Sequence, residues 1–241
     1  MNKTILRSLA PEGRLRAAIN LSNFLLVPRV LADGTPTGTS PDVAARIATE
    51  LDVECEFICF GRPGFIADAV DSDQWDIGNI ADEPARAALM DFTNPYVLID
   101  AHFLVRDDPK IRQCRDVDKG ETTIAVLERS AYDLWLTENL RHATIRRASS
   151  MVEARELFSR GAVTVLAGLK PALMEEVANN PLYKVLEPRF TAIRQAVGIK
   201  KGSPEALEFL NKIIVEMIST GFIEDSLKRH GVLDKLSVPG L

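Results

Sequence analysis

The chain has 241 residues, of which 46% are hydrophobic and 26% are charged, a composition typical of soluble globular proteins. This length accommodates one large domain or two domains of roughly 100–150 residues each. The formal net charge of −5 argues against a nucleic acid as partner, because nucleic-acid binding requires a basic surface. No run of about 18 apolar residues is present, so we expect no helix that spans a membrane.

Strands and helices are expected to alternate through the first half of the chain. The expected strands are 15–20, 53–60, 75–81 and 96–106, the expected helices are 40–53 and 63–74, and a helical turn is expected to start within 84–92. Asp42 is the expected N-cap of the helix at 40–53, in which apolar residues recur every four positions from Val43. Alternation of strands with helices of about ten residues indicates βαβ units and a largely parallel sheet.

A second α/β series follows a polar, turn-rich segment at 108–120. Its expected strands are 122–128, 144–149, 162–168, 183–187 and 190–202, and its expected helices are 130–142, 150–161, 170–180, 203–221 and 222–231. The long apolar strands at 96–106 and 190–202 both suit a crossover between lobes. We therefore predict an α/β, bilobal fold in which two crossover strands join the lobes and the last helices return to the first lobe.

The cysteines and histidines do not suggest a metal site. Cys55 and Cys59 alternate with Val53 and Phe57 along one face of the strand at 53–60, which we interpret as a core face. Cys114 is isolated, and the three histidines match no zinc spacing. No metal and no cofactor is assigned.

The N-terminal sequence bears on the compartment. The first sixteen residues contain no apolar segment of about 7–15 residues, which a signal peptide requires. As the sequence stands, the chain is expected in the cytoplasm. If Met1 replaces a removed leader, the expected compartment is the periplasm.

The stretch WDIGNIADEPARAALMDFTNPY, residues 75–96, raises the question of a binding site. An apolar strand ends in Asp82 and Glu83, and Arg86 stands one turn into a short helix. Arg86 could be a solvated arginine paired with Glu83 at i,i+3, an interaction worth only about 0.2–0.5 kcal/mol. It could instead be a bidentate fork for a ligand carboxylate, because ligands of open α/β sheets bind beyond the carboxyl ends of strands.

This stretch carries a resemblance to a known family, together with GTSPDVAARIATEL, IAVLERSAYDLWLTENL and the segment from AIRQAVGIKKG to SLKRHG. The chain resembles bacterial extracellular solute-binding protein family 3, the substrate-binding proteins of polar amino-acid ABC transporters, over about residues 13–232. The most specific element is an arginine five residues before Asp-Phe-Ser/Thr-x-Pro-Tyr, here Arg86 before DFTNPY. The chain would be a divergent member without an evident signal peptide.

The resemblance implies a type 2 periplasmic-binding fold with a discontinuous first lobe. Residues 1–104 and 197–241 would form the first lobe and residues 105–196 the second. Hinge strands near 100–105 and 193–198 would let the lobes close around a ligand.

The same resemblance implies two sides of a carboxylate clamp. Arg86 would hold the α-carboxylate of the ligand. Ser130 would add its hydroxyl and the N–H groups at the start of its helix, and Ser130 also suits an ordinary N-cap. Arg129 stands where the family usually has glycine, which makes this loop less permissive and more basic.

Other positions depart from the family pattern or match it loosely. Gly168 stands where amino-acid binders usually place an aspartate for the ligand ammonium, and Ala81 and Glu83 replace threonines. Phe24 is a loose match to an aromatic residue after the first strand. Gln195 could line the cleft or be a solvated strand residue.

Those departures leave the ammonium site open. Glu83 or Asp82 could replace the missing acid from the first lobe. Alternatively, the ligand is a carboxylate without an ammonium group, and Lys170 lies near the pocket rim. A buried, unpaired acid would destabilise the site by several kcal/mol, so a ligand must satisfy Glu83 or leave it hydrated.

The expected function is binding of a small polar, carboxylate-bearing, amino-acid-like solute in the cleft between the lobes, without catalysis. The expected partners are that solute and an ABC permease, and the chain is expected to be a monomer. The alternative is a lyase similar to cyclohexadienyl dehydratase, which acts on prephenate or arogenate. That chemistry needs a general acid beside basic groups, and Glu83 or Glu128 with the nearby arginines could provide them.

Overall fold

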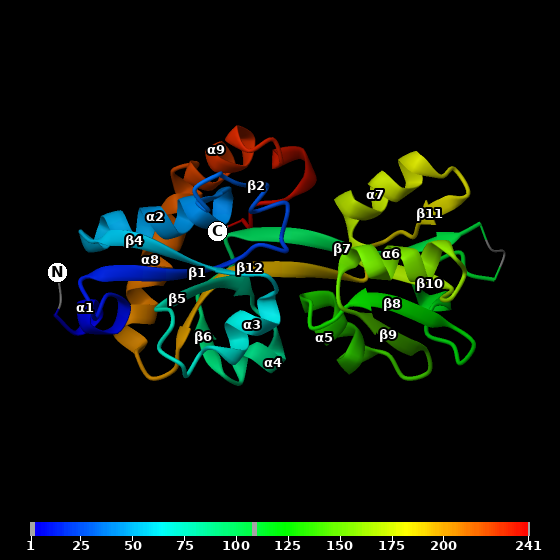
Figure 1. Ribbon diagram of the computed structural model, residues 1–241, viewed down its shortest axis with the longest axis horizontal. Helices are drawn as coiled ribbons and strands as arrows, with labels where there is room; N and C mark the ends of the chain where they lie inside the picture. The colour runs from blue at the N-terminus through cyan, green and yellow to red at the C-terminus, as the bar shows by residue number, and fades with distance from the viewer. Residues whose placement is uncertain (1–2, 108–109, 241) are drawn as a thin grey trace. The chain divides into compact units, whose positions relative to one another are not determined.

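The computed structural model describes residues 3–107 and 110–240 and divides into two compact units (Figure 1). Unit 1 comprises Met1–Leu98 and Arg194–Leu241, and unit 2 comprises Ile99–Ile193. The chain therefore passes between the units twice, once within strand β7 (Val97–Arg106) and once within strand β12 (Thr191–Lys200).

Unit 1 is an α/β layer structure. Its helices are α1 (Lys3–Leu9), α2 (Thr39–Leu51), α3 (Pro63–Asp68), α4 (Pro84–Ala87), α8 (Pro204–Ser219), α9 (Phe222–Arg229) and the 3-10 helix η2 (Leu233–Lys235). Its strands are β1 (Arg14–Asn20), β4 (Glu54–Phe60), β5 (Ile77–Ala81) and β6 (Met90–Phe92), with a separate hairpin of β2 (Arg29–Val30) and β3 (Pro36–Thr37). In Figure 1, α2 and α9 lie on one side of these strands and α3 and α4 on the other.

The sheet of unit 1 runs in the order β4-β1-β5-β12. Strand β1 is parallel to β4 and β5, whereas β12 returns antiparallel to β5 and also pairs with β6. All of β5 is buried, as expected for a central strand between two helical layers. The carboxyl ends of β1 and β5 therefore lie at one end of the sheet, which is where ligands of open α/β folds bind.

Unit 2 repeats the α/β pattern with fewer helices. Its strands besides β7 are β8 (Thr123–Leu127), β9 (Thr144–Ala148), β10 (Val165–Leu169) and β11 (Tyr183–Val185). Its helices are α5 (Ala131–Asn139), α6 (Met151–Ser159), α7 (Lys170–Asn179) and the 3-10 helix η1 (Cys114–Asp116). The sheet order is β7-β10-β8-β9, with β8 parallel to β9 and β10, and β7 antiparallel to β10 and β11.

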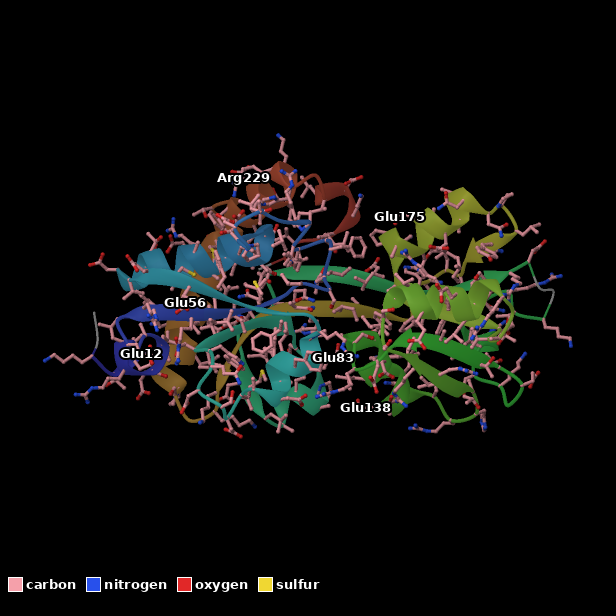
Figure 2. The ribbon with its side chains drawn as sticks, in the orientation of Figure 1. Glu12, Glu56, Glu83, Glu138, Glu175 and Arg229 are labelled. Atoms are coloured by element: carbon pink, nitrogen blue, oxygen red, sulfur yellow. The ribbon has the colours of Figure 1, made fainter. Side chains whose placement is uncertain are left out.

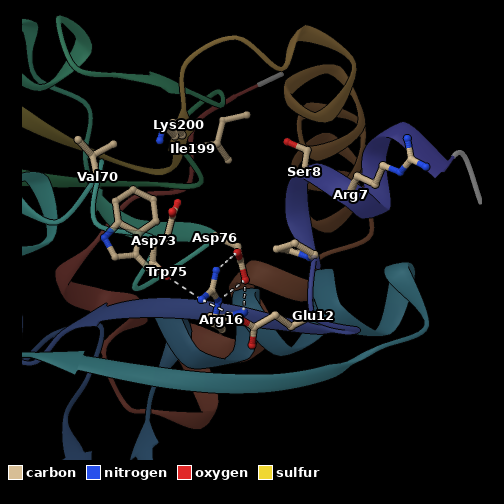
Figure 3. Close-up of a pocket in the computed structure, with 11 residues that line it drawn as sticks. Arg7, Ser8, Glu12, Arg16, Val70, Asp73, Trp75, Asp76, Ile199 and Lys200 are labelled. Atoms are coloured by element: carbon tan, nitrogen blue, oxygen red, sulfur yellow. Dashed lines mark hydrogen bonds and ion pairs between the residues drawn. The ribbon is translucent and has the colours of Figure 1, made fainter.

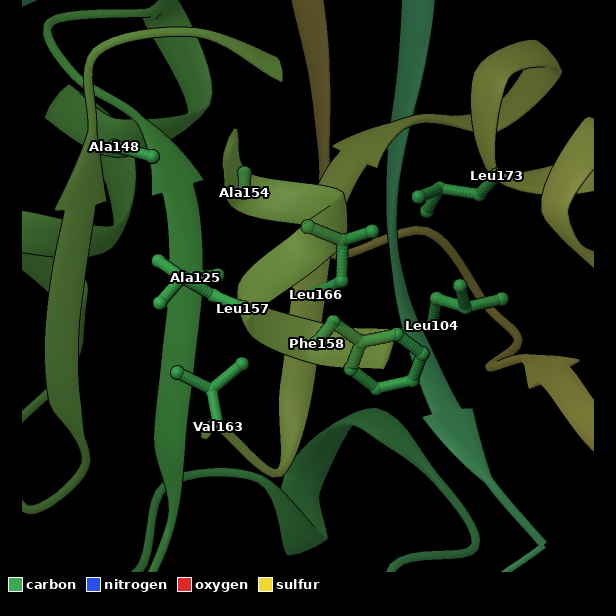
Figure 4. Close-up of a cluster of buried hydrophobic side chains, with 9 residues drawn as sticks. All are labelled: Leu104, Ala125, Ala148, Ala154, Leu157, Phe158, Val163, Leu166 and Leu173. Atoms are coloured by element: carbon green, nitrogen blue, oxygen red, sulfur yellow. The ribbon is translucent and has the colours of Figure 1, made fainter. Parts of the chain in front are cut away.

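The core of unit 2 forms where α6 packs across β8 and β10 (Figure 4). Its buried members are Leu104, Ala125, Ala148, Ala154, Leu157, Phe158, Val163, Leu166 and Leu173. The rings of Phe158 and Tyr183 meet edge to face, with centroids 5.0 Å apart. The Arg106 guanidinium covers the Phe158 ring at 4.4 Å, so a long polar side chain closes one side of this core.

The predicted α/β elements are present, and several of their boundaries differ. The helix expected at 63–74 ends at Asp68, because the polar residues that follow form turns and Asp73 adopts a left-handed φ of 52°. The segment 84–92 starts with a helical turn as expected, in α4, and its residues 90–92 form β6 because they pair with β12. Helix α1 and the β2–β3 hairpin were not predicted from the sequence.

Asp42 does not cap α2, which begins at Thr39 after Gly38. The Asp42 carboxylate instead accepts hydrogen bonds from Ser226 Oγ at 2.6 Å and from Arg229 Nη2 at 2.7 Å. It therefore joins α2 to α9 within unit 1, a role that depends on residues far along the chain.

The expectation of a core face on the strand at 53–60 was wrong. Cys59 is exposed, and Val53, Cys55 and Phe57 are only half-buried. The reason is that β4 stands at the end of the strand order of unit 1, with β1 as its one strand partner in the part of the chain that the structure describes. Period-2 alternation shows which residues share a face, but it does not show whether a further strand covers the edge.

Residues 3–107 and 110–240 contain neither a membrane-spanning helix nor a cluster of metal ligands. No helix in this part of the chain is long and apolar enough to cross a membrane. Within the same residues, no group of three or more His, Cys, Asp or Glu side chains is placed to hold a metal ion.

Gly38 provides a test of the turn that starts α2. Its φ of 145° is rare for residues with a side chain, and a Cβ there would overlap the Leu26 carbonyl oxygen and lie 2.7 Å from Pro28 Cδ. We expect Gly38→Ala to lower the free energy of unfolding by at least about 2 kcal/mol, measured by urea denaturation. Gly61→Ala is the control, because no atom lies within 4 Å of the position that its added methyl group would take; equal stabilities of the two variants would contradict the overlap.

Candidate functional site

The first group of candidate residues lies where β5 ends and α4 begins. Ala81 is the last residue of β5, and Pro84 is the first residue of α4. Glu83 occupies the N-cap position, and its carbonyl oxygen accepts hydrogen bonds from the N–H groups of Arg86 (2.9 Å) and Ala87 (2.8 Å). Proline suits this first helical position because its missing N–H would have no partner there.

Arg86 is a buried arginine, with only 3% of its surface exposed. Its Nη1 donates a hydrogen bond of 3.0 Å to the Ala81 carbonyl oxygen, which orients the guanidinium at the end of β5. Glu83, labelled in Figure 2, is 6% exposed. The interpretation of Arg86 and Glu83 as a solvated surface pair therefore does not fit this structure.

Strand β12 brings Gln195 to the same place. Gln195 is the register partner of Ala81 and is 5% exposed, so it is not a solvated strand residue. The Asp82 N–H donates to the Arg194 carbonyl oxygen at 2.8 Å, and Arg194 Nε lies 3.5 Å from Asp82 Oδ2. Unit 1 thus gathers Ala81, Asp82, Glu83, Arg86 and Gln195 at one strand end.

The DFTNPY corner has a structural role in holding β12 in place. The N–H of Thr93 donates to the Val197 carbonyl at 2.9 Å, and Thr93 Oγ1 accepts from the Val197 N–H at 3.1 Å. The Tyr96 N–H donates to the Gln195 carbonyl at 2.8 Å. The Tyr96 hydroxyl lies 3.0 Å from Ser40 Oγ, and burial raises the pKa of this fully enclosed phenol. The motif therefore fixes the backbone that carries Gln195.

Phe24 differs from the other unit 1 candidates. It lies in the segment between β1 and β2 and is 40% exposed, whereas the residues at the end of β5 are mostly buried. An exposed aromatic ring after the first strand is compatible with contact to a ligand, and it is also an ordinary surface feature.

The second group of candidates lies in unit 2, between β8 and α5. Ser130 is the N-cap of α5, and its Oγ accepts a hydrogen bond of 3.2 Å from the Asp133 N–H, so the N-cap prediction is confirmed. Arg129 precedes it with a left-handed φ of 57°. That conformation suits glycine and is unfavourable by roughly 1–2 kcal/mol for a residue with a Cβ.

Asp133 stabilises this unusual turn. Its buried Oδ2 accepts hydrogen bonds from the Arg129 N–H at 2.7 Å and from Arg147 Nε at 3.1 Å. Thr137 Oγ1 donates to the Asp133 carbonyl oxygen at 2.7 Å, which ties the same residue into α5. A carboxylate that accepts these bonds offsets the backbone strain at Arg129.

Gly168 is packed against apolar side chains of unit 2. A Cβ at this position of β10 would lie 3.1 Å from Met151 Cε and 3.2 Å from Leu173 Cδ2. A side chain there would therefore point toward the cluster between α6 and α7. This glycine can offer only its backbone to a ligand.

Two polar residues lie near Gly168, and only one of them, Lys170, was singled out from the sequence. Lys170, expected near the pocket rim, forms an ion pair of 2.6 Å with Glu187, and this hydrogen bond lowers the pKa of the Glu187 carboxyl. His102, the register partner of Gly168, is 1% exposed, and its Nδ1 lies 2.8 Å from the Leu186 carbonyl oxygen. His102 sits within an apolar run, so only its pairing across the sheet reveals its neighbours.

A separate cavity of about 440 Å³ lies elsewhere in unit 1, beside α1 and the start of β1 (Figure 3). Arg16 and Asp76 form its main polar feature, with Nη2 and Oδ1 2.7 Å apart and Nε and Oδ2 3.1 Å apart. The bond to Asp76 raises the pKa of the Arg16 guanidinium. Because these opposite charges satisfy each other, we do not assign the ligand to this cavity.

We expect the turn at Arg129 to depend on Asp133. The substitution Asp133→Ala removes the carboxylate that accepts hydrogen bonds from the Arg129 N–H and the Arg147 guanidinium. The free energy of unfolding should therefore fall by about 2–4 kcal/mol. Thermal and urea denaturation measure the effect. Glu138→Ala, on the exposed part of the same helix (Figure 2), is the control and should change stability by less than about 0.5 kcal/mol. Similar stabilities of both variants would show that Asp133 does not support the turn.

The sequence of this chain matches the model of a known protein family. The family model described as bacterial extracellular solute-binding proteins, family 3, matches residues 28–232. A search of curated proteins returned no match.

Solved structures of similar fold cover almost the whole chain. A mutant of ArgBP from T. maritima has a TM-score of 0.75 at 18% identity and covers 94% of this chain and 99% of its own. The substrate-binding protein AbpA from Streptococcus pneumoniae, bound to L-arginine, has a TM-score of 0.75 at 20% identity and covers 95% and 99%. The ancestral amino acid-binding protein AncCDT-1, a precursor of cyclohexadienyl dehydratase, has a TM-score of 0.75 at 24% identity and covers 93% and 97%.

The predicted fold class is therefore confirmed, because these neighbours share the two-unit α/β architecture of type 2 periplasmic-binding proteins. The family match extends over more than four fifths of the chain and includes both groups of candidate residues. The chain belongs to the bacterial extracellular solute-binding proteins, family 3.

Proposed function

We propose that this chain binds a small polar solute through its carboxylate, as the substrate-binding protein of an ABC-type transporter. The observation that carries the proposal is the buried Arg86 guanidinium at the carboxyl end of β5, in a chain that belongs to a solute-binding family. No covalent chemistry is part of this function.

Arg86 suits a carboxylate for physical reasons. The guanidinium is planar and permanently charged, and it forms two parallel hydrogen bonds to the two oxygens of a carboxylate. The Ala81 carbonyl fixes its orientation, so less side-chain entropy is lost when a ligand binds. The Coulomb attraction between a guanidinium and an anion is also stronger at a buried site, where water and salt screen it less.

The ligand class that we propose is an amino acid, including basic ones. Asp82 and Glu83 supply acidic groups beside Arg86, which suit a ligand that carries an ammonium group as well as a carboxylate. The neighbour from Wolinella succinogenes is complexed with lysine and the one from Streptococcus pneumoniae is bound to L-arginine, and these ligands fit the same charge pattern. Gln195 is the proposed neutral hydrogen-bonding residue of this group, and Phe24 the proposed apolar contact.

Unit 2 would contribute a second set of contacts to the same solute. We include Ser130 and Arg129 as the polar groups at the start of α5, with Gly168 offering its backbone. The strands β7 and β12, through which the chain passes between the units, are the proposed hinge. The family's description as extracellular supports a periplasmic location and an ABC permease as partner.

The non-enzymatic assignment leaves one alternative to test. The neighbour AncCDT-1 is itself an amino acid-binding protein but is a precursor of an enzyme. Glu128 follows β8 directly and would be the acidic group to examine if this chain were a lyase. The proposal of a binding protein therefore needs a direct assay for turnover.

We expect L-arginine or L-lysine to raise the melting temperature, because ligand at 100 times its Kd stabilises the folded state by about 2.7 kcal/mol. Arg86→Lys keeps the positive charge but cannot form the bidentate pair of hydrogen bonds to a carboxylate. For this variant, the melting temperatures with and without ligand should therefore be equal. Lys212→Ala, which removes a cation 72% exposed on α8, is the control and should keep the shift. A full shift in Arg86→Lys would rule out the arginine clamp.

Prephenate and arogenate separate the binding protein from the lyase. The proposal predicts no aromatic product when either compound is incubated with the protein and the ultraviolet absorbance is followed. Glu128→Gln gives the matched comparison, because an enzymatic rate that depends on a general acid would fall in this variant. Product formation by the unchanged protein that is lost in Glu128→Gln would refute the non-enzymatic assignment.

A further inference from the structure

Strand β4 is an open sheet edge in unit 1. It stands at the end of the strand order, and its only strand partner within residues 3–107 and 110–240 is β1. None of its seven residues is fully buried, whereas all of β5 is. Edge strands carry a row of backbone N–H and C=O groups that a further strand can bind.

The register shows which backbone groups of β4 face outward. The Phe60 carbonyl accepts a hydrogen bond of 2.9 Å from the N–H of Leu21, the residue directly after β1. The backbone N–H and C=O groups of Phe60 therefore point toward β1. Orientation alternates along a strand. The N–H and C=O groups of Cys55, Phe57 and Cys59 therefore point away from β1, toward the open edge.

We propose that β4 pairs antiparallel with β4 of a second copy of this chain, with the two-fold axis at Phe57. This register places Cys55 opposite Cys59 of the second copy. The outward residues then form hydrogen-bonded pairs, in which opposite residues exchange both N–H···O bonds. The outward N–H and C=O groups of each copy would thus form hydrogen bonds with those of the other copy.

The charge pattern of β4 tolerates this pairing. In the same register Glu54 lies opposite Phe60 of the second copy, and Glu56 lies opposite Ile58 of the second copy. No two acids are directly opposed, and the nearest like charges, Glu56 of each copy, are diagonal neighbours roughly 7–8 Å apart, where repulsion is weaker than between opposed residues. Glu56, labelled in Figure 2, is further neutralised by Arg14, whose Nε lies 2.8 Å from its Oε2.

The second copy is favoured over another partner because the strand is complementary to itself. The outward sequence reads Cys-Phe-Cys, which is symmetric about Phe57, and Phe57 meets its own copy at the axis. Aromatic pairs across strands add to sheet stability by about 0.2–1 kcal/mol. The proposed dimer differs from the monomer expected from the sequence, and the experiments below distinguish the two.

The cysteines provide a direct test of the register. Hydrogen-bonded antiparallel partners have Cα atoms about 5.5 Å apart, which lies within the range of disulfides. Cys59 and Cys59 of the second copy would instead be offset by four residues along the strand, or roughly 13 Å. Only the pair Cys55 with Cys59 of the second copy can therefore be cross-linked.

The experiment uses the full chain with Cys114→Ser as the common background. Oxidised glutathione converts two thiols to one disulfide and is itself reduced to two glutathione molecules. The reaction is run at mildly alkaline pH, because burial raises the pKa of both thiols, that of Cys55 to about 11. Cys55→Ser alone and Cys59→Ser alone should remain monomeric on non-reducing gels, whereas a mixture of the two should form a cross-linked dimer.

Sedimentation equilibrium of the reduced protein tests the association without a covalent bond. Phe57→Pro should lose the dimer while folding normally, because the N–H that proline removes makes no bond to β1. Circular dichroism and the melting temperature confirm its fold. Phe65→Ala, at an exposed residue of α3, is the control and should keep the dimer.

Three results would overturn the proposal. One is a cross-linked dimer of Cys55→Ser or Cys59→Ser alone, which would show a different register. Another is a mixture of the two variants that gives no dimer although the reduced protein remains folded. The third is a dimer of Phe57→Pro as stable as that of the unchanged chain, which would place the association on another surface.

Discussion

The close antiparallel pairing of β5 with β12 is the constraint on which the site in unit 1 depends. Gly78 and Gly198 face each other in this pairing. A Cβ on Gly198 would lie 2.8 Å from Met90 Sδ, and a Cβ on Gly78 would lie 3.1 Å from Ile66 Cγ2. The two glycines therefore let the bulky side chains of Ile66 and Met90, which belong to one buried cluster, pack closely on one face of this pair of strands. The same register continues to Gln195 beside Ala81.

The register has consequences for charge as well as for packing. Gln195 pairs with Ala81, so the residue after Ala81, Asp82, lies beside Arg194. The Asp82 N–H donates a hydrogen bond to the Arg194 carbonyl oxygen. The chain can then turn at Pro84 and direct Arg86 back to the Ala81 carbonyl. A backbone carbonyl, whose position does not depend on the identity of neighbouring side chains, thus helps to orient the Arg86 guanidinium.

Much of the fold follows from local patterns, whereas the surroundings of the candidate residues do not. Hydrophobic periodicity predicted most strands and helices, and the position of Arg86 after an apolar strand predicted its place at a strand end. The burial of Gln195 and the carboxylate of Asp133 beside Arg129 arise from residues distant in sequence, so no local pattern contains them. The edge position of β4 is likewise decided by strand order, which is a property of the whole sheet.

The terminal strand of unit 2 shows why self-pairing is a specific property of β4. Strand β9 also stands at the end of the strand order, and it carries Arg146 and Arg147 in succession. A two-fold axis at Arg146 would place that guanidinium opposite its own copy, and such like-charge contacts disfavour strand addition. In β4 the central residue is Phe57 and the acids face apolar residues. Both units therefore have an open edge, but the sequence opposes self-association at one and permits it at the other.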